Sequence, residues 1–174
     1  MTLGFSQQIN GKPNYFIEKI WAAIKEHKLT GIEHIQFDGY KWEYKEQFGE
    51  FWPGLLDNHK PKLHTIRRDT DNKWKAGNKI HPVINNRTAN RFQFAPVIKC
   101  VSTQRIAINY TESVYKMPYY QIDNSEVMSP SRSDYDYHLT RLAINDGFNG
   151  IDDFLAYFNT DFTGKIIHWT DLKY

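Results

Sequence analysis

The chain has 174 residues, the length of one domain and enough to bury a substantial hydrophobic core. Hydrophobic residues make up 40% and charged residues 24%, as in ordinary globular proteins. The formal net charge of +2 is too small for the dense basic surface that is typical of duplex-DNA binders. A single cysteine, Cys100, excludes an intramolecular disulfide and a cysteine-based zinc site, and its apolar neighbours predict that it is buried.

The sequence has no run of about eighteen apolar residues and no secretory signal pattern, so we expect a cytoplasmic protein without a membrane partner. The seven histidines form no HxH or HExxH pair, and there is no glycine loop of the phosphate-binding kind. We therefore expect no metal and no other cofactor.

Aromatic residues are abundant at 16% of the chain, with 5 Trp, 11 Tyr and 11 Phe. Two interpretations remain open. The rings can fill a core in place of aliphatic side chains, or some of them can form a face on which flat ligands stack.

The first third of the chain predicts a strand at 3–9, a turn, and a helix at 14–27. The helix is indicated by apolar residues that recur at intervals of three and four and give one apolar face. Residues 28–60 combine aromatic and charged side chains without a clear period, and predict an irregular region with one or two short helices. We expect residues 10–60 together to form an N-terminal helical insert.

The rest of the chain predicts an α+β fold. A polar stretch at about 123–136 predicts a loop that is prone to disorder. A helix at 137–145 is expected to end at Gly147, and a second helix at 150–159 begins with acidic residues. The expected strands are 62–67, 79–84, 91–102, 104–110 and 164–170.

The segment Lys62-Leu63-His64-Thr65-Ile66-Arg67 is the main candidate for a site. Side chains alternate along an extended chain, so Thr65 and Arg67 share one face. A hydroxyl beside a guanidinium suits an anion or a carbonyl group. The alternative is a strand with a solvated basic fringe.

Basic residues are concentrated between 60 and 91, where the only acids are Asp69 and Asp71. With aromatic residues interleaved, this excess fits a surface that follows phosphates and stacks bases. A soluble basic face is the alternative. The basic residues are Lys60, Lys62, Arg67, Arg68, Lys73, Lys75, Lys79, Arg87 and Arg91.

Three segments follow one another along the chain. The first is Lys-x-x-Thr-Ile-Arg at 62–67, followed by Trp74-Lys75-Ala76-Gly77-Asn78-Lys79-Ile80. The second is Leu142 to Phe148, and the third is the closing Ile166-Ile167-His168-Trp169-Thr170. In this order the three segments resemble the ASCH domain family, in which the second reads Ala-x-x-Glu/Asp-Gly-Phe.

The resemblance implies that residues 1–174 form a single PUA-like mixed β-barrel with a few short helices and the N-terminal helical insert. It also implies a cleft beside the Lys62–Arg67 strand, which would bind RNA, a nucleotide or a modified nucleoside.

An enzyme is the alternative that the resemblance implies. Small bacterial relatives remove the acetyl group from N4-acetylcytidine with a lysine, a threonine and an acidic residue, which Lys62, Thr65 and Asp146 match by position. Asp146 stands where those amidohydrolases have glutamate. The shorter side chain shifts the carboxylate by about 1 Å, and such a shift can cost on the order of a hundredfold in rate.

We expect a further set of residues to bind the ligand.

The strands of His64 and His168 are expected to be neighbours in this fold, so that both side chains can line the cleft. The alternative is that these two histidines have a purely structural role. A ribonuclease that uses one of them as acid or base is a third functional hypothesis. The expected ligand-binding residues are Arg67, Arg68, His64, Trp74, Lys75 and His168.

Overall fold

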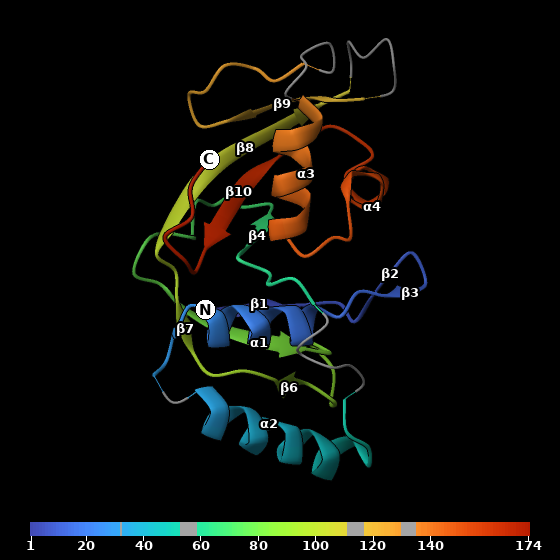
Figure 1. Cartoon of the computed structure of the whole chain (residues 1–174), viewed down its shortest axis with the longest axis vertical. Helices are drawn as coiled ribbons and strands as arrows, with labels where there is room; N and C mark the ends of the chain where they lie inside the picture. Colours follow the sequence, from blue (N-terminus) through green and yellow to red (C-terminus); the bar gives the residue numbers. More distant parts are fainter. Residues whose placement is uncertain (32, 53–58, 111–116, 130–134) are drawn as a thin grey trace. The chain divides into compact units, whose positions relative to one another are not determined.

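The protein is described by a computed structural model that covers residues 1–174 except 32, 53–58, 111–116 and 130–134. The described chain divides into two compact units. The first unit contains Met1–Lys62 and Asn78–Lys99, and the second contains Leu63–Gly77 and Cys100–Tyr174. Figure 1 shows the helices and strands of both units.

The first unit combines a small sheet, a short hairpin and two helices. The hairpin pairs β2 (Gln8–Ile9) with β3 (Lys12–Pro13). In the sheet, β5 pairs in parallel with β1 and antiparallel with β6 and β7. The sheet strands are β1 (Thr2–Gly4), β5 (Lys79–Ile84), β6 (Phe92–Gln93) and β7 (Ile98–Lys99).

Helix α1 (Phe16–Glu26) confirms the helix expected at 14–27. Its apolar face is buried, including Ile20 and Trp21. The indole N–H of Trp21 donates to the carbonyl oxygen of Phe94 at 2.8 Å, so the helix is fixed to the chain after β6 by a buried hydrogen bond as well as by packing.

Helix α2 (Glu33–Phe48) is longer than expected, because the sequence predicted only short helices in this region. Aromatic rings attach it to the unit: Tyr44 lies 5.5 Å and Phe48 5.9 Å from the ring of Phe92, and both pairs are edge-to-face. Part of the expected insert, residues 53–58, lies outside the described residues.

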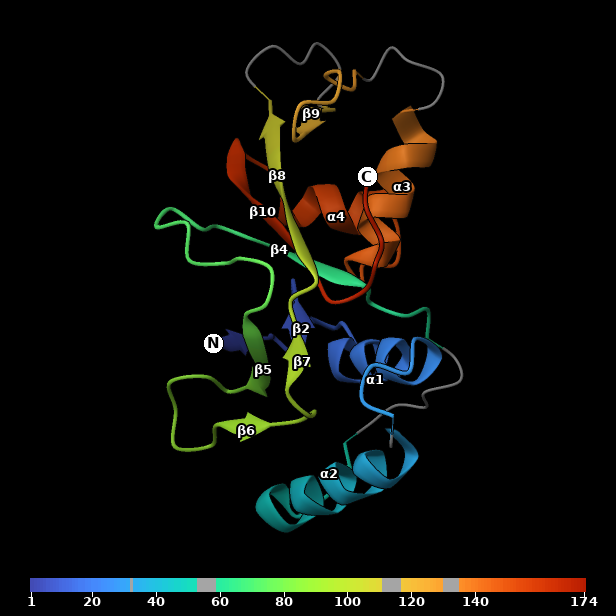
Figure 2. The ribbon, with the colours of Figure 1, turned by 90° about the vertical axis from the view of Figure 1, so that its left-hand side faces the viewer.

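The second unit is a four-stranded antiparallel sheet in the order β4-β10-β8-β9, with two helices. Figure 2 shows α3 and α4 on the same side of this sheet. Buried side chains from both layers, such as Ile166 and Leu142, form the core. The elements are β4 (His64–Arg67), β8 (Ser102–Asn109), β9 (Tyr119–Ile122), α3 (Tyr135–Asn145), α4 (Ile151–Tyr157) and β10 (Phe162–His168).

The structure differs in part from the loop that the sequence predicts at 123–136. Asp123 begins a tight turn in which its Oδ1 accepts the amide of Arg105 at 2.7 Å, and Tyr120 bridges to Met128. Helix α3 begins at Tyr135, two residues earlier than expected, because the Tyr135 ring is buried and its hydroxyl donates to the carbonyl of Pro118. Residues 130–134 lie outside the described residues.

The α+β class is confirmed, but no sheet formed by the described residues closes into the expected barrel. The long strand predicted at 91–102 is instead two short strands, β6 and β7. Pro96 lacks an N–H donor and interrupts that run. Within the described parts of the chain, no helix has the length and hydrophobicity needed to span a membrane.

We predict that Gly164→Ala destabilises the second unit. A Cβ at this position of β10 would overlap the carbonyl oxygen of Arg67 and the ring of Phe162, so the backbone of the sheet would have to shift. We expect a loss of roughly 2 kcal/mol or more in the free energy of unfolding, measured by urea denaturation.

Gly39→Ala is the matched control. Gly39 lies in α2 with nothing within 4 Å of the added methyl group, so this change should raise stability by about 1 kcal/mol through helix propensity. Equal stability of Gly164→Ala and wild type would contradict the packing described for β10.

Candidate functional site

Asp146 connects the end of α3 to the edge strand β4. Its Oδ1 accepts the backbone amide of Ile66 at 3.2 Å, and the amide of Leu63 donates to the carbonyl oxygen of Asn145 at 2.8 Å. Among the strands of the described residues, β4 pairs only with β10, so Asp146 satisfies a donor on the other edge of β4. Two of the segments that carry the family resemblance are therefore in direct contact.

His64 lies between an acid and a phenol. Its Nδ1 is 3.7 Å from Asp146 Oδ1, and its Nε2 is 2.8 Å from the hydroxyl of Tyr174. That hydroxyl also accepts a hydrogen bond from Asn145 Nδ2 at 2.9 Å. Burial raises the pKa of Tyr174, against the opposing effect of the bond from Asn145, so the phenol is neutral at pH 7.

The backbone of Tyr174 is held as well as its ring. The side-chain amide of Gln104 donates to the Tyr174 carbonyl at 2.8 Å, and its oxygen accepts the Tyr174 amide at 2.9 Å. The same Gln104 nitrogen donates to Asp123 at 3.0 Å. Tyr174 was not expected at the site from sequence, and no motif marked it.

The two histidines expected to be neighbours are paired in the sheet. His64 and His168 are register partners on β4 and β10, their ring centroids are 5.3 Å apart, and neither is exposed to solvent. Burial lowers the pKa of His168 to about 4. Among the described residues neither of its ring nitrogens has a hydrogen-bond partner, and the ring is neutral at pH 7.

Thr65 and Arg67 lie on the other face of β4, as the alternation of side chains predicts. Thr65 is buried and Arg67 is half-buried. In the register with β10, these residues pair with Ile167 and Lys165.

The turn after β4 is fixed by Asp69. Its carboxylate accepts the amides of Lys73 and Trp74 at 2.9 and 3.0 Å and pairs with Lys165 Nζ at 3.0 Å. Burial acts to raise the pKa of Asp69, but the two amides and Lys165 outweigh it and hold the pKa below its usual value. Lys165 also donates to the carbonyl of Trp74 at 2.7 Å, so this acid and this lysine shape the turn.

The other expected ligand-binding residues differ in exposure. Trp74 is buried, whereas Arg68 and Lys75 are exposed. The guanidinium of Arg68 lies 5.2 Å from the ring centre of Phe162, so its flat face is already occupied by an aromatic ring.

Lys62 belongs to the first unit. Its amide donates to the carbonyl of Lys19 at 2.9 Å, and its ammonium lies 4.6 Å from the ring centre of Phe16. The side chain is buried, which is rare for lysine and typical of a functional position.

Glu18 is a buried acid that the sequence analysis missed, because charged residues in an amphipathic helix are normally placed on its solvated face. It lines a cavity of about 200 Å³ with neighbours that include Asn14 and Phe16. Burial raises the pKa of Glu18, and a bond to the backbone and the charge of Lys19 act against this.

The basic residues between 60 and 91 are distributed over both units. In the second unit, Lys73 forms an ion pair with Asp71 at 2.5 Å, and both side chains are exposed. The other basic residues of this stretch that belong to the second unit are Arg67, Arg68 and Lys75.

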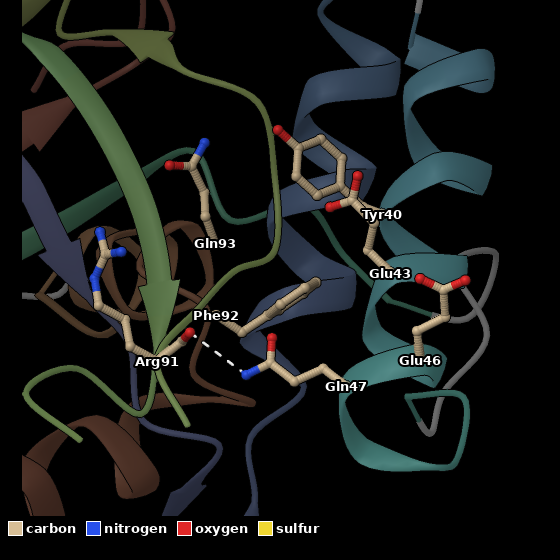
Figure 3. Close-up of a pocket in the computed structure, with 7 residues that line it drawn as sticks. All are labelled: Tyr40, Glu43, Glu46, Gln47, Arg91, Phe92 and Gln93. Carbon is tan, nitrogen blue, oxygen red and sulfur yellow. Dashed lines mark hydrogen bonds between the residues drawn. The ribbon is translucent and has the colours of Figure 1, made fainter. Parts of the chain in front are cut away.

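A separate pocket of about 600 Å³ lies between α2 and β6 in the first unit. Figure 3 shows the carboxylates of Glu43 and Glu46 on its α2 side, and the amide of Gln47 directed at the carbonyl of Arg91, 3.5 Å away. Phe92 contributes a ring to its wall. Acceptors outnumber donors on the helix side, so this side of the pocket suits a group rich in N–H.

No family model matches the chain, and neither a curated protein nor a solved structure matches it. The family resemblance therefore rests on the residues quoted above. Over the described ranges, no three or more His, Cys, Asp or Glu side chains gather in a way that could hold a metal ion.

We predict that His168 makes stability depend on pH. Its pKa is about 4 in the folded protein and about 6.5 when unfolded, so the unfolded chain binds more protons between these values. The stability that neutral His168 permits is complete above pH 6.5 and is lost as the pH falls towards 4. As the pH falls from 6.5 to 5, the free energy of unfolding of wild type should therefore decrease by about 2 kcal/mol more than that of His168→Gln. Urea denaturation at each pH would measure this.

The exposed His138 provides the control, and His138→Gln should keep the pH dependence of wild type. Parallel pH curves for wild type and His168→Gln would show that His168 is not buried as a neutral ring.

Proposed function

We propose that the chain is an ASCH-type, PUA-like domain that binds RNA, a nucleotide or a modified nucleoside beside the strand from Lys62 to Arg67. The observation that carries this proposal is the contact of Asp146 with the amide of Ile66 and its proximity to His64. These residues come from segments 80 positions apart that the resemblance selects, and buried polar side chains gathered at one edge strand are typical of a functional site.

The arrangement of elements in the second unit supports the same proposal. β4 is followed by a polar turn, α3 ends at the Asp146-Gly147-Phe148 segment, and β10 pairs with β4 inside the sheet. This is the order in which the three motifs are expected.

The side chains of β4 define the ligand chemistry. The Thr65 hydroxyl can donate and accept, and the Arg67 guanidinium presents a planar fork of donors. A pyrimidine carbonyl or a phosphate oxygen suits such a pair. His168 is buried and neutral at pH 7, which makes it a poor general acid and weakens the ribonuclease hypothesis.

An amidohydrolase is the second candidate, and one observation favours it. Lys62, Thr65 and Asp146 are only 1, 2 and 3% exposed, although each is polar. Burying such groups costs free energy unless they are paired, so their burial indicates a selected role.

In this proposal the amine of Lys62 takes the proton of the Thr65 hydroxyl while the oxygen attacks the acyl carbon of an N4-acylated cytidine. The carbon–nitrogen bond breaks, the protonated Lys62 returns this proton through Asp146 to the leaving amine, and water then hydrolyses the threonine ester, which releases the carboxylic acid and restores the Thr65 hydroxyl.

We predict that Thr65→Val weakens the binding of N4-acetylcytidine, cytidine monophosphate or single-stranded RNA by about tenfold, because one hydrogen bond to the ligand is lost. Calorimetric titration would measure this. Thr163→Val is the matched control, since Thr163 is exposed on β10 and should leave binding unchanged. If folded wild type binds none of the three probes, the proposed function is wrong.

For the enzyme candidate, we predict hydrolysis of N4-acetylcytidine, followed by the change in ultraviolet absorbance. Turnover should fall at least a hundredfold in both Lys62→Ala and Thr65→Ala, since each removes a group that reacts in the first step. Lys60→Ala, at an exposed lysine nearby in sequence, should retain activity. Binding without turnover in wild type would leave a binding domain and reject the amidohydrolase.

A further inference from the structure

Two large aromatic rings are exposed together in the first unit. Trp42 of α2 is 58% exposed and Phe51 is 37% exposed. Their ring centroids are 5.3 Å apart with an interplanar angle of 72°, so they support each other edge to face. Burying these rings would be favourable, and adjacent exposed rings of this size mark a contact surface.

Two lysines lie over these rings. Lys45 Nζ is 4.5 Å from the centre of Phe51 and 5.0 Å from that of Trp42, and Lys41 Nζ is 4.9 Å from the centre of Phe51. Cation–π attraction therefore holds one positive charge over the exposed indole and a second over the adjoining Phe51 ring. We call Lys41, Trp42, Lys45 and Phe51 the Trp42 patch.

The lysines of the Trp42 patch and the residues that face the pocket lie on different sides of α2. Tyr40, Glu43 and Gln47 are three and four residues apart and face the pocket of Figure 3, with Glu46 at its border. Lys41 and Lys45 are four residues apart and lie on a different side of the helix. The patch thus offers cations and rings, while the carboxylate of Glu43 faces the pocket.

We propose that the Trp42 patch binds single-stranded nucleic acid, with a base stacked on Trp42 and the adjoining phosphates next to Lys41 and Lys45. This inference rests on the proposed function, because it assigns a second contact to a chain that handles RNA. A single strand supplies flat bases and phosphates in alternation, which matches a ring flanked by cations. An acidic peptide supplies the charge but no flat face for the indole.

Two acidic residues determine the direction in which the nucleic-acid strand crosses α2. Asp38 and Glu46 lie four residues before and after Trp42, so they flank it along the helix axis and repel phosphates there. The strand therefore crosses α2 at the Trp42 patch and does not follow the helix.

The test is fluorescence anisotropy of a labelled oligouridylate of about ten nucleotides, titrated with the full chain at several salt concentrations. Trp42→Ala should weaken binding about tenfold and leave the salt dependence unchanged. The double change Lys41→Gln with Lys45→Gln should reduce the slope of log K against log salt by about 1.4, or about 0.7 for each lost cation.

Matched controls come from outside the patch. Tyr137 is 62% exposed and has Arg141 5.8 Å from its ring centre, so Tyr137→Ala removes an equivalent ring beside a cation and should bind as wild type. Lys12→Gln, at an exposed lysine of β3, should leave the slope unchanged. Circular dichroism and thermal melting would establish that each variant is folded.

Two outcomes overturn the inference while leaving the proposed function standing. One is wild-type affinity and salt slope in the patch variants together with weakened binding in Thr65→Val. The other is that an oligoglutamate peptide of equal charge binds the patch as tightly as the oligouridylate, which would indicate a protein partner. Absence of oligouridylate, nucleotide and nucleoside binding in wild type would reject the proposed function, and the inference with it.

Discussion

Burying the carboxylate of Asp146 beside an edge strand is unfavourable, and the second unit offsets this with a hydrogen bond from Ile66 and the proximity of His64. The contacts of Asn145 and Asp146 with β4 fix the end of α3, and they satisfy backbone amides on the edge of this strand. Asp146 and Tyr174 together determine which way the His64 ring faces. Tyr174 completes the arrangement by occupying the other nitrogen of His64. A polar group that fixes local structure in this way also restricts what can replace it, so a longer side chain at position 146 would disturb this edge contact.

Local patterns were sufficient to predict the elements whose stability is local. The apolar repeat expected at 14–27 is seen in α1, because this helix presents one face to a core, and the final strand expected at 164–170 is seen as β10. Helix α2 was underestimated since its rings are spread around the axis, and only contact with Phe92 shows which of them face inward. Strand β9 was not predicted, because its residues Tyr119–Ile122 gain strand geometry from pairing with β8 and not from a pattern of their own.

The site was predictable to a similar extent. The strands of His64 and His168 were expected to be neighbours from the family resemblance, and they are paired in the structure. The resemblance also selected Asp146, but it did not predict the hydrogen bond of this residue with the Ile66 amide. The part played by Tyr174 could not be predicted, since it depends on how the segment after β10 returns to Gln104. Glu18 was also missed, because burial of an acid in an amphipathic helix is decided by what packs over it.

If β4 and the Asp146 segment form one ligand site, as we propose, a titration of isotope-labelled protein with N4-acetylcytidine will show it in the amide chemical shifts. The largest shifts should fall on Thr65, Ile66, Arg67, Asn145 and Asp146, because the Ile66 amide hydrogen bond reports any change at Asp146. Saturable shifts that leave these amides unmoved and fall elsewhere in the chain would show that the ligand binds at another site.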